Sequence, residues 1–251
     1  MEDVIMSKRF KAIHGVVDEE AHFLRIRRGV RNEKSAFTLA EVLITLGVIG
    51  VIAAMTIPTL SANYRKQEVV SKLKKVYSMV NQAIKLSEVE YGEQANWDMD
   101  CGVSGSIKCT KEEAIEKFNK YIGKHLEIIK TDIGQNGTFL VYLKDGSILS
   151  VRYWLYDYGF YINKNAIINE KPGINYFRFR FNAKLPAGQD LGKNRDFGKG
   201  TFEPYYRNWN GTREQLVSGD LYSCDGNEPA YCAKLIQYDG WQIKDDYPLR
   251  F

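Results

Sequence analysis

Histidine is rare in this sequence, with three among 251 residues, and two of the three lie before residue 37. The sequence also has no glycine-rich phosphate loop, no nucleophile elbow and no pair of metal ligands at helical spacing. We therefore expect no catalytic residues, no metal site, no cofactor and no enzymatic activity. A membrane-anchored enzyme is the alternative, and it would require acidic residues that the fold gathers in a cleft.

An excess of one charge is also missing, since the formal net charge is only +4. Residues 1–36 carry eight Lys or Arg and six Asp or Glu, which leaves 27 basic and 25 acidic residues in the rest. This balance does not favour nucleic acid as a partner. The composition, 44% apolar and 13% aromatic, is typical of a chain that folds.

Cysteine is limited to four residues in two close pairs, Cys101 with Cys109 and Cys224 with Cys232, each eight positions apart. An even number in local pairs favours two short-loop disulfides in an oxidising compartment, although the sequence does not fix the connectivity. Paired zinc ligands usually have about two to four residues between them, fewer than here. Reduced, buried thiols are the remaining alternative.

One long apolar run is present, from residue 37 to residue 60, and its single charged residue is Glu41. These 24 residues are enough to cross a bilayer as a helix, which takes roughly 20. A basic cluster at residues 25–34 precedes the run, which predicts that the C-terminal bulk lies outside the cytoplasm. A secretory signal peptide fits poorly, because its cleavage site would follow the apolar run.

The segment 34–43 reads KSAFTLAEVL and resembles the prepilin cleavage and methylation motif of type IV pilins and type II secretion pseudopilins. The resemblance implies that a prepilin peptidase cuts between Ala36 and Phe37 and that the new amino terminus is methylated. It also implies that Glu41, the fifth mature residue, pairs with the amino terminus of a neighbouring subunit. Pro58 is then the twenty-second mature residue, where many members of the family have a proline that bends the helix.

Two features depart from the pattern. The family usually has glycine before the cut, where this chain has Ala36, and the leader of 36 residues is long, so a start at Met6 is an alternative. Simpler interpretations also exist for two residues: Glu41 could reach the membrane surface, and Pro58 could end the helix. An unpaired carboxylate costs about 2.5–3.5 kcal/mol at the centre of a bilayer and less near the end of the span, where Glu41 lies, so the residues alone leave both interpretations of Glu41 open.

Residues 61–91 keep a helical spacing but become polar. The apolar positions recur every three or four residues and predict an amphipathic helix that ends near Tyr91, before Gly92. We expect its apolar stripe to pack under a globular head and its lysines to face solvent. The apolar positions are Val69, Leu73, Val76, Tyr77, Val80 and Ile84.

Residues 92–251 are predicted to form the head. Thr110 and Glu113 suggest a capping box at the start of a short helix that ends near Gly123. A hairpin is expected from 139–143 and 148–153, and the alternation in 176–181 predicts a strand with three phenylalanines on one face. The expected fold class is thus α+β and pilin-like, with a long N-terminal helix packed on an antiparallel sheet.

The head contains two segments with residue types that occur in binding sites, one for nucleic acid and one for calcium. The opposite face of strand 176–181 carries Tyr176, Arg178 and Arg180, which could contact single-stranded nucleic acid, but such polar outer faces are common. Some major pseudopilins bind calcium through a C-terminal acidic loop. The acidic residues after position 219 lack the ordered spacing of a calcium loop, so no metal site is expected.

These observations divide the chain into a leader (1–36), a transmembrane or filament-core helix (37–60), an amphipathic helix (61–91) and a head (92–251). We expect a single-pass protein of the bacterial inner membrane that becomes a structural subunit of a type IV pilus-like filament or a secretion pseudopilus. The large, loop-rich head favours a pseudopilin or a minor pilin. Its expected partners are prepilin peptidase, other pilin or pseudopilin subunits and membrane lipid. The alternative is an uncleaved, membrane-anchored envelope protein.

Overall fold

The computed structural model describes residues 37–103, 105–182 and 201–251. The chain divides into two compact units, one up to Ile52 and one from Ala53 to Phe251. Helix α1 (Leu39–Tyr91) runs through both and is 53 residues long. It ends before Gly92, whose φ of 77° is the left-handed conformation that commonly follows a helix.

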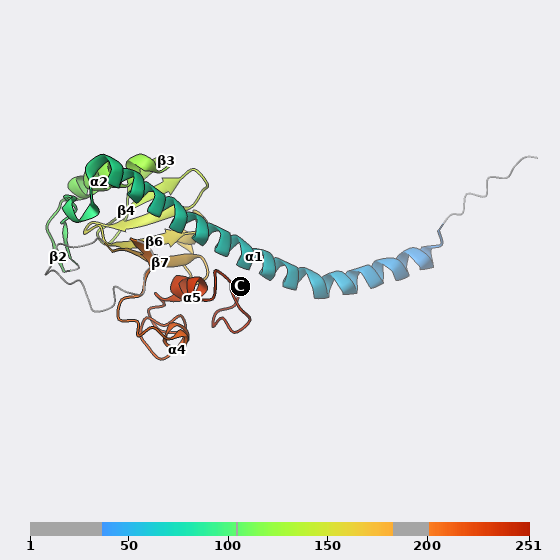
Figure 1. The fold of residues 1–251 in the computed structure, drawn as a ribbon. Coiled ribbons are helices and arrows are strands. Elements are labelled where there is room, and N and C mark those ends of the chain that lie inside the picture. The colour runs from blue at the N-terminus through green and yellow to red at the C-terminus, as the bar shows by residue number, and fades with distance from the viewer. Residues whose placement is uncertain (1–36, 104, 183–200) are drawn as a thin grey trace, which may run out of the picture. The chain divides into compact units, whose positions relative to one another are not determined.

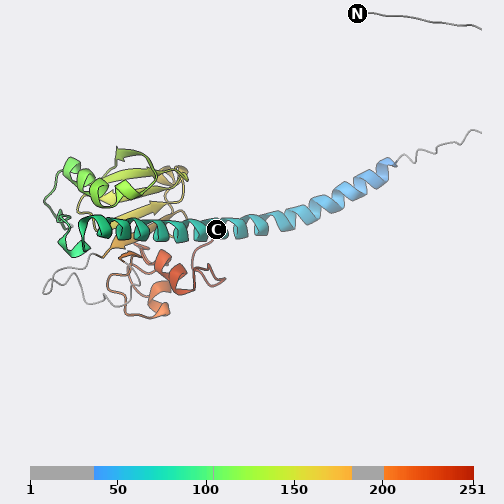
Figure 2. The same cartoon turned by 45° about the horizontal axis from the view of Figure 1, so that its top comes forward.

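The second half of α1 packs against the sheet of the head (Figures 1 and 2). Its side chains at Val69, Leu73, Val76, Val80 and Ile84 are at most 2% exposed, and they recur at intervals of three and four residues. This is the apolar stripe of an amphipathic helix laid on a core. The predicted amphipathic helix and its end near Tyr91 are confirmed.

The sheet has six strands in the order β3-β4-β5-β6-β7-β8, and each pairs antiparallel with the next along the chain. It is a meander, the simplest antiparallel arrangement, so every strand lies beside its sequence neighbour. The strands are β3 (Ile128–Ile133), β4 (Thr138–Leu143), β5 (Ile148–Arg152), β6 (Asp157–Tyr161), β7 (Tyr176–Phe181) and β8 (Phe202–Pro204).

The register of the sheet separates an inner from an outer face. Phe139, Val151, Tyr158 and Phe179 lie opposite one another on neighbouring strands, and all are at most 2% exposed. The ring of Phe118 on helix α2 (Lys111–Tyr121) contacts Phe139 and Tyr158, so this row faces the helices. The next row along the strands must point to the opposite face. It consists of Leu140, Ser150, Gly159 and Arg178.

Short elements complete the head. Helix α2 begins after Thr110, which forms the predicted capping box with Glu113. The other elements are η1 (Gln94–Asn96), β1 (Gly102–Val103), β2 (Ser106–Ile107), α2 (Lys111–Tyr121), η2 (Gly123–His125), α3 (Asn165–Ile168), α4 (Arg213–Val217) and α5 (Cys232–Tyr238).

The C-terminal segment joins the last strand to α1 through polar contacts. The side-chain amide of Asn81 donates to the carbonyl oxygen of Phe202 and accepts from its N–H, at 2.8 and 3.0 Å. The Tyr77 hydroxyl donates to the fully buried carboxylate of Glu203, which also lies 3.7 Å from Lys234 on α5. The two bonds from Asn81 occupy the backbone of Phe202 at one edge of the sheet, which would otherwise be open to pairing.

The α+β fold class is confirmed, with a long helix packed on an antiparallel sheet. The predicted hairpin is confirmed as β4 and β5. The predicted strand is confirmed as β7, in which Phe177, Phe179 and Phe181 are buried. The sequence did not predict β3, β6 or β8. Strand β6 contains Gly159 in its centre, which weakens the strand pattern, and β8 has only three residues.

Candidate assembly segment

The start of α1 is organised by Thr38 and Glu41. The N–H and the hydroxyl of Thr38 both donate to Oε2 of Glu41, each at 2.9 Å, and the Glu41 N–H donates to the Thr38 hydroxyl at 3.2 Å. This is the reciprocal arrangement of a capping box, which satisfies backbone donors at the beginning of a helix. Both bonds from Thr38 reach the same carboxylate oxygen, and within the described residues Oε1 has no recorded donor.

The helix that follows is apolar on every side. Val42, Leu43 and Ile44 point in three directions about 100° apart, and they are 40%, 60% and 67% exposed. A helix that is apolar all round needs either a protein core or a membrane. No part of the most apolar 18-residue window of α1 is buried within the protein.

The exposed large apolar side chains of this segment form a continuous series along the helix. The segment from residue 37 to residue 60 contains one charged residue, Glu41. The exposed apolar side chains are Phe37, Leu39, Val42, Leu43, Ile44, Leu46, Val48, Ile49, Val51, Ile52, Met55, Ile57 and Leu60. Among the described residues, α1 is the one helix that is long and apolar enough to cross a membrane.

Pro58 lies inside α1, which continues for 33 residues beyond it to Tyr91. The interpretation of Pro58 as a helix end is therefore wrong. A proline inside a helix removes one backbone hydrogen bond and favours a bend, so the predicted bend at this position stays a prediction.

Of the residues expected at the processing site, Ala36 and the leader before it lie outside the described part of the chain. Phe37 is 84% exposed and precedes the helix. Thr38 was not predicted as a site residue, although it caps the start of α1. The spacing Thr38–Glu41 is that of a capping box, so the sequence carried the signal.

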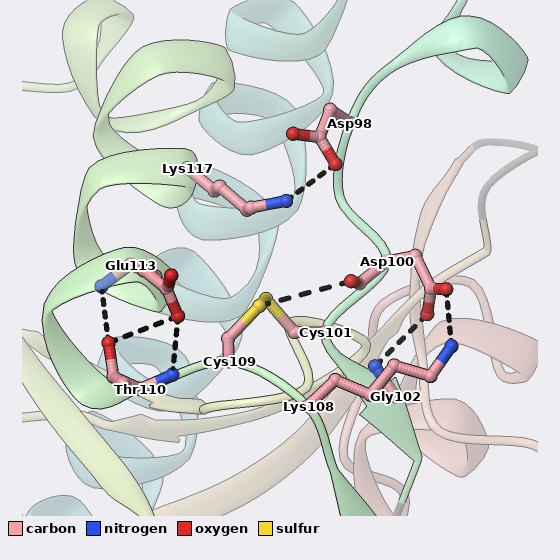
Figure 3. Close-up of a disulfide and its surroundings, with 9 residues drawn as sticks. All are labelled: Asp98, Asp100, Cys101, Gly102, Lys108, Cys109, Thr110, Glu113 and Lys117. Carbon is pink, nitrogen blue, oxygen red and sulfur yellow. Dashed lines mark hydrogen bonds and ion pairs between the residues drawn. A yellow bond between two sulfur atoms is a disulfide. The ribbon is translucent and has the colours of Figure 1, made fainter.

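The first cysteine pair is a disulfide, Cys101–Cys109, whose Cα atoms lie 4.8 Å apart (Figure 3). It closes a small loop that contains the two-stranded sheet of β1 and β2. Asp100 accepts from Lys108 and from the N–H of Gly102, and these bonds lower its pKa. The loop is thus fixed by one covalent and two polar links directly before α2.

The second pair is the disulfide Cys224–Cys232, with Cα atoms 4.7 Å apart. Both of its cysteines are at most 1% exposed, whereas Cys109 of the first pair is partly exposed. All four cysteines are paired locally, so the expectation of two short-loop disulfides is confirmed. The sequence alone had left the connectivity open.

Two acidic residues near the C-terminus, Asp239 and Asp246, bind the guanidinium group of Arg213. Arg213 donates to both oxygens of Asp239 at 2.8 Å and to both oxygens of Asp246 at 2.8 and 2.9 Å. Lys244 adds a bond to Asp239 at 2.8 Å. Burial raises the pKa of Asp239, but the bonds from Arg213 and Lys244 outweigh this effect and lower it. Within the described residues, no three His, Cys, Asp or Glu side chains are placed to hold a metal ion.

The arginines considered for nucleic acid are paired with acids. Arg178 lies 3.9 Å from Glu228, and Arg180 lies 3.3 Å from Asp157. The face therefore carries both signs of charge rather than a row of free cations, and nucleic-acid binding gains no support from it.

A family of unknown function (DUF6613) matches residues 59–251, which is more than three quarters of the chain. The chain belongs to this family. The DUF6613 region begins directly after Pro58, so it contains the amphipathic half of α1 and the whole head and leaves out all but the last two residues of the apolar segment 37–60. No curated protein and no solved structure matches the chain.

Proposed function

We propose that this protein is a structural subunit of a type IV pilus-like filament or of a type II secretion pseudopilus. The observation that carries the proposal is the apolar segment 37–60, exposed on every side and continuous with the helix that supports the head. Such a segment requires a bilayer before assembly and can exchange lipid for neighbouring helices afterwards. The resemblance of residues 34–43 to the prepilin motif supplies the processing step.

The start of the helix supports a specific mode of assembly. Cleavage before Phe37 would create an ammonium group four residues from Glu41, at the membrane face. Thr38 bonds Oε2 of Glu41, which leaves Oε1 to accept from the amino terminus of a neighbouring subunit. In hydrocarbon an unpaired carboxylate is costly, so this pairing would favour assembly and set the axial position of adjacent helices.

The proposed location is the bacterial inner membrane, with the head outside the cytoplasm. The two disulfides agree with an oxidising compartment for the head. The basic residues between 25 and 34 agree with a cytoplasmic leader.

Intact mass measurement and N-terminal sequencing of protein purified from native membranes test the proposal. We expect a chain that begins at Phe37 and is one methyl group heavier than the unmodified polypeptide. The matched control is the same strain without its prepilin peptidase, in which the leader should remain attached.

A chain that keeps its leader in the presence of the peptidase would contradict the proposal. That result would favour the uncleaved, membrane-anchored envelope protein. The observation behind this second candidate is Ala36, which stands where the pilin family usually has glycine.

A further inference from the structure

The outer face of the sheet, which points away from α1 and α2, contains a groove of about 740 Å³. Its floor is the cross-strand row Leu140, Ser150, Gly159 and Arg178. The volume lies within the range of small-molecule binding sites, roughly 300–1,000 Å³. The proposed filament function makes no use of this groove.

Aromatic rings form a platform at one side of the floor. The rings of Tyr161 and Tyr176 lie opposite one another on β6 and β7, with centroids 4.7 Å apart. Tyr176 can take this position because Gly159 has no side chain: a Cβ there would lie 2.4 Å from the Tyr176 ring. Both rings are half-buried, so each keeps an accessible part. Tyr205 and Trp154 also line the groove.

The polar groups around these rings are held in place by one another. Tyr161 donates to Glu170 at 2.7 Å, and the Trp154 indole N–H donates to Asp157 at 2.8 Å. Arg152 donates to the carbonyl oxygen of Asn136 at 2.7 Å. These bonds order the side chains and still leave carboxylate oxygens and guanidinium N–H groups free to bond a ligand, because each group has more sites than it uses here.

The charges of the groove identify the class of ligand. Two arginines, Arg152 and Arg178, lie among three acids, Asp157, Glu170 and Glu228. A polyanion such as nucleic acid would meet the acids, and a polycation would meet the arginines. An extended peptide usually adds to a sheet edge or fills apolar pockets, whereas this groove lies on a face and is lined mainly by polar groups.

We infer that the groove binds a neutral carbohydrate. A sugar ring has apolar C–H faces that stack on aromatic rings, and its hydroxyls both donate and accept, as the mixed acids and arginines require. Tyr161 and Tyr176 form the stacking platform, and Glu170, Asp157 and Arg178 bond the hydroxyls.

Calorimetry on the full, oxidised chain tests the inference, in a zwitterionic detergent without a sugar headgroup. The probes are cellotetraose and maltotetraose as neutral ligands, with tetragalacturonate and an oligothymidylate as polyanions. We expect at least one neutral tetrasaccharide to bind and neither polyanion to bind.

Three variants locate the site. Tyr161→Ala should raise the Kd about tenfold or more, because it removes the ring and the bond to Glu170. Tyr161→Phe keeps the ring and should raise the Kd less. Tyr238→Ala, a half-exposed ring on α5 outside the groove, is the matched control and should leave the Kd unchanged.

The inference is overturned if neither neutral tetrasaccharide binds, or if the polyanions bind instead. It is also overturned if Tyr161→Ala binds as tightly as the unchanged protein. Thermal unfolding of each variant shows whether the head is intact. The test is independent of leader processing, since every residue of the groove lies in the head.

Discussion

Glu41 has two carboxylate oxygens with different surroundings at the start of α1. Oε2 accepts both bonds from Thr38, and this arrangement is local to one chain. Oε1 is the oxygen that the proposed assembly uses. The two roles can be separated, because Thr38 contributes only to the first of them.

We predict that Glu41→Gln abolishes filament assembly and leaves membrane insertion and leader cleavage intact. The amide keeps the size of the side chain but cannot neutralise an ammonium group. The measurement is the amount of subunit in the sheared filament fraction. Thr38→Ala is the control: it removes the two capping bonds of the Thr38 hydroxyl, retains the carboxylate and should still assemble. Equal loss in both variants would assign Glu41 a capping role alone.

In the C-terminal loops, Arg213 favours the ionised form of two acidic residues, Asp239 and Asp246. Its bonds lower the pKa of Asp246, and with Lys244 they outweigh burial at Asp239. A group whose pKa is lowered by folding stabilises the folded protein at any pH above its pKa in the unfolded chain, which is about 3.9 for Asp. This contribution is lost as the pH falls through the pKa of the group in the folded protein.

We therefore predict that the free energy of unfolding falls as the pH drops below about 4. In Arg213→Gln this acid dependence should be weaker, and stability at pH 7 should fall by about 3 kcal/mol, because the buried Asp239 loses its main partner. Urea unfolding at pH 7 and at pH 3 measures both effects. Arg207→Gln, at an exposed position, serves as the control, and an Arg213 variant with the native pH profile would refute the prediction.

At the scale of elements, the features predicted from sequence are those with a local cause. The capping box of α2, the apolar stripe of α1 and the alternation in β7 each follow from spacing within one segment. Strand β8 has three residues and is held by its pairing with β7 and by Asn81, 121 residues away, so no local pattern could predict it. The groove depends on the same kind of distant contact, since its lining comes from loops and α3 as well as from five strands.

The two disulfides differ in burial, which predicts an order of reduction. Cys109 is partly exposed, whereas Cys224 and Cys232 are buried. A thiol reductant reaches an exposed sulfur first, because exchange requires access to the sulfur. We expect mild reduction to open Cys101–Cys109 while Cys224–Cys232 remains intact, as detected by alkylation and peptide mass mapping. Simultaneous opening under native conditions would contradict this expectation.

At the scale of the whole molecule, α1 is joined to the far end of the sheet by the two bonds between Asn81 and Phe202. We predict that Asn81→Ala lowers the free energy of unfolding by about 2 kcal/mol, because two bonds are lost and a strand edge is left unsatisfied. Denaturant unfolding measures the change. Asn63→Ala, at an exposed position on the same helix, is the control and should have little effect.

The strict succession of strands has a consequence for export. A head that crosses a membrane starting with its own N-terminal part can add each strand to the one before it, and each disulfide closes within nine consecutive residues. The contacts of residues 202–203 with Tyr77 and Asn81, and the bond of Tyr247 to Gly173, must wait for distant parts of the chain. The sheet can thus form during translocation, and the arrival of β8 completes it.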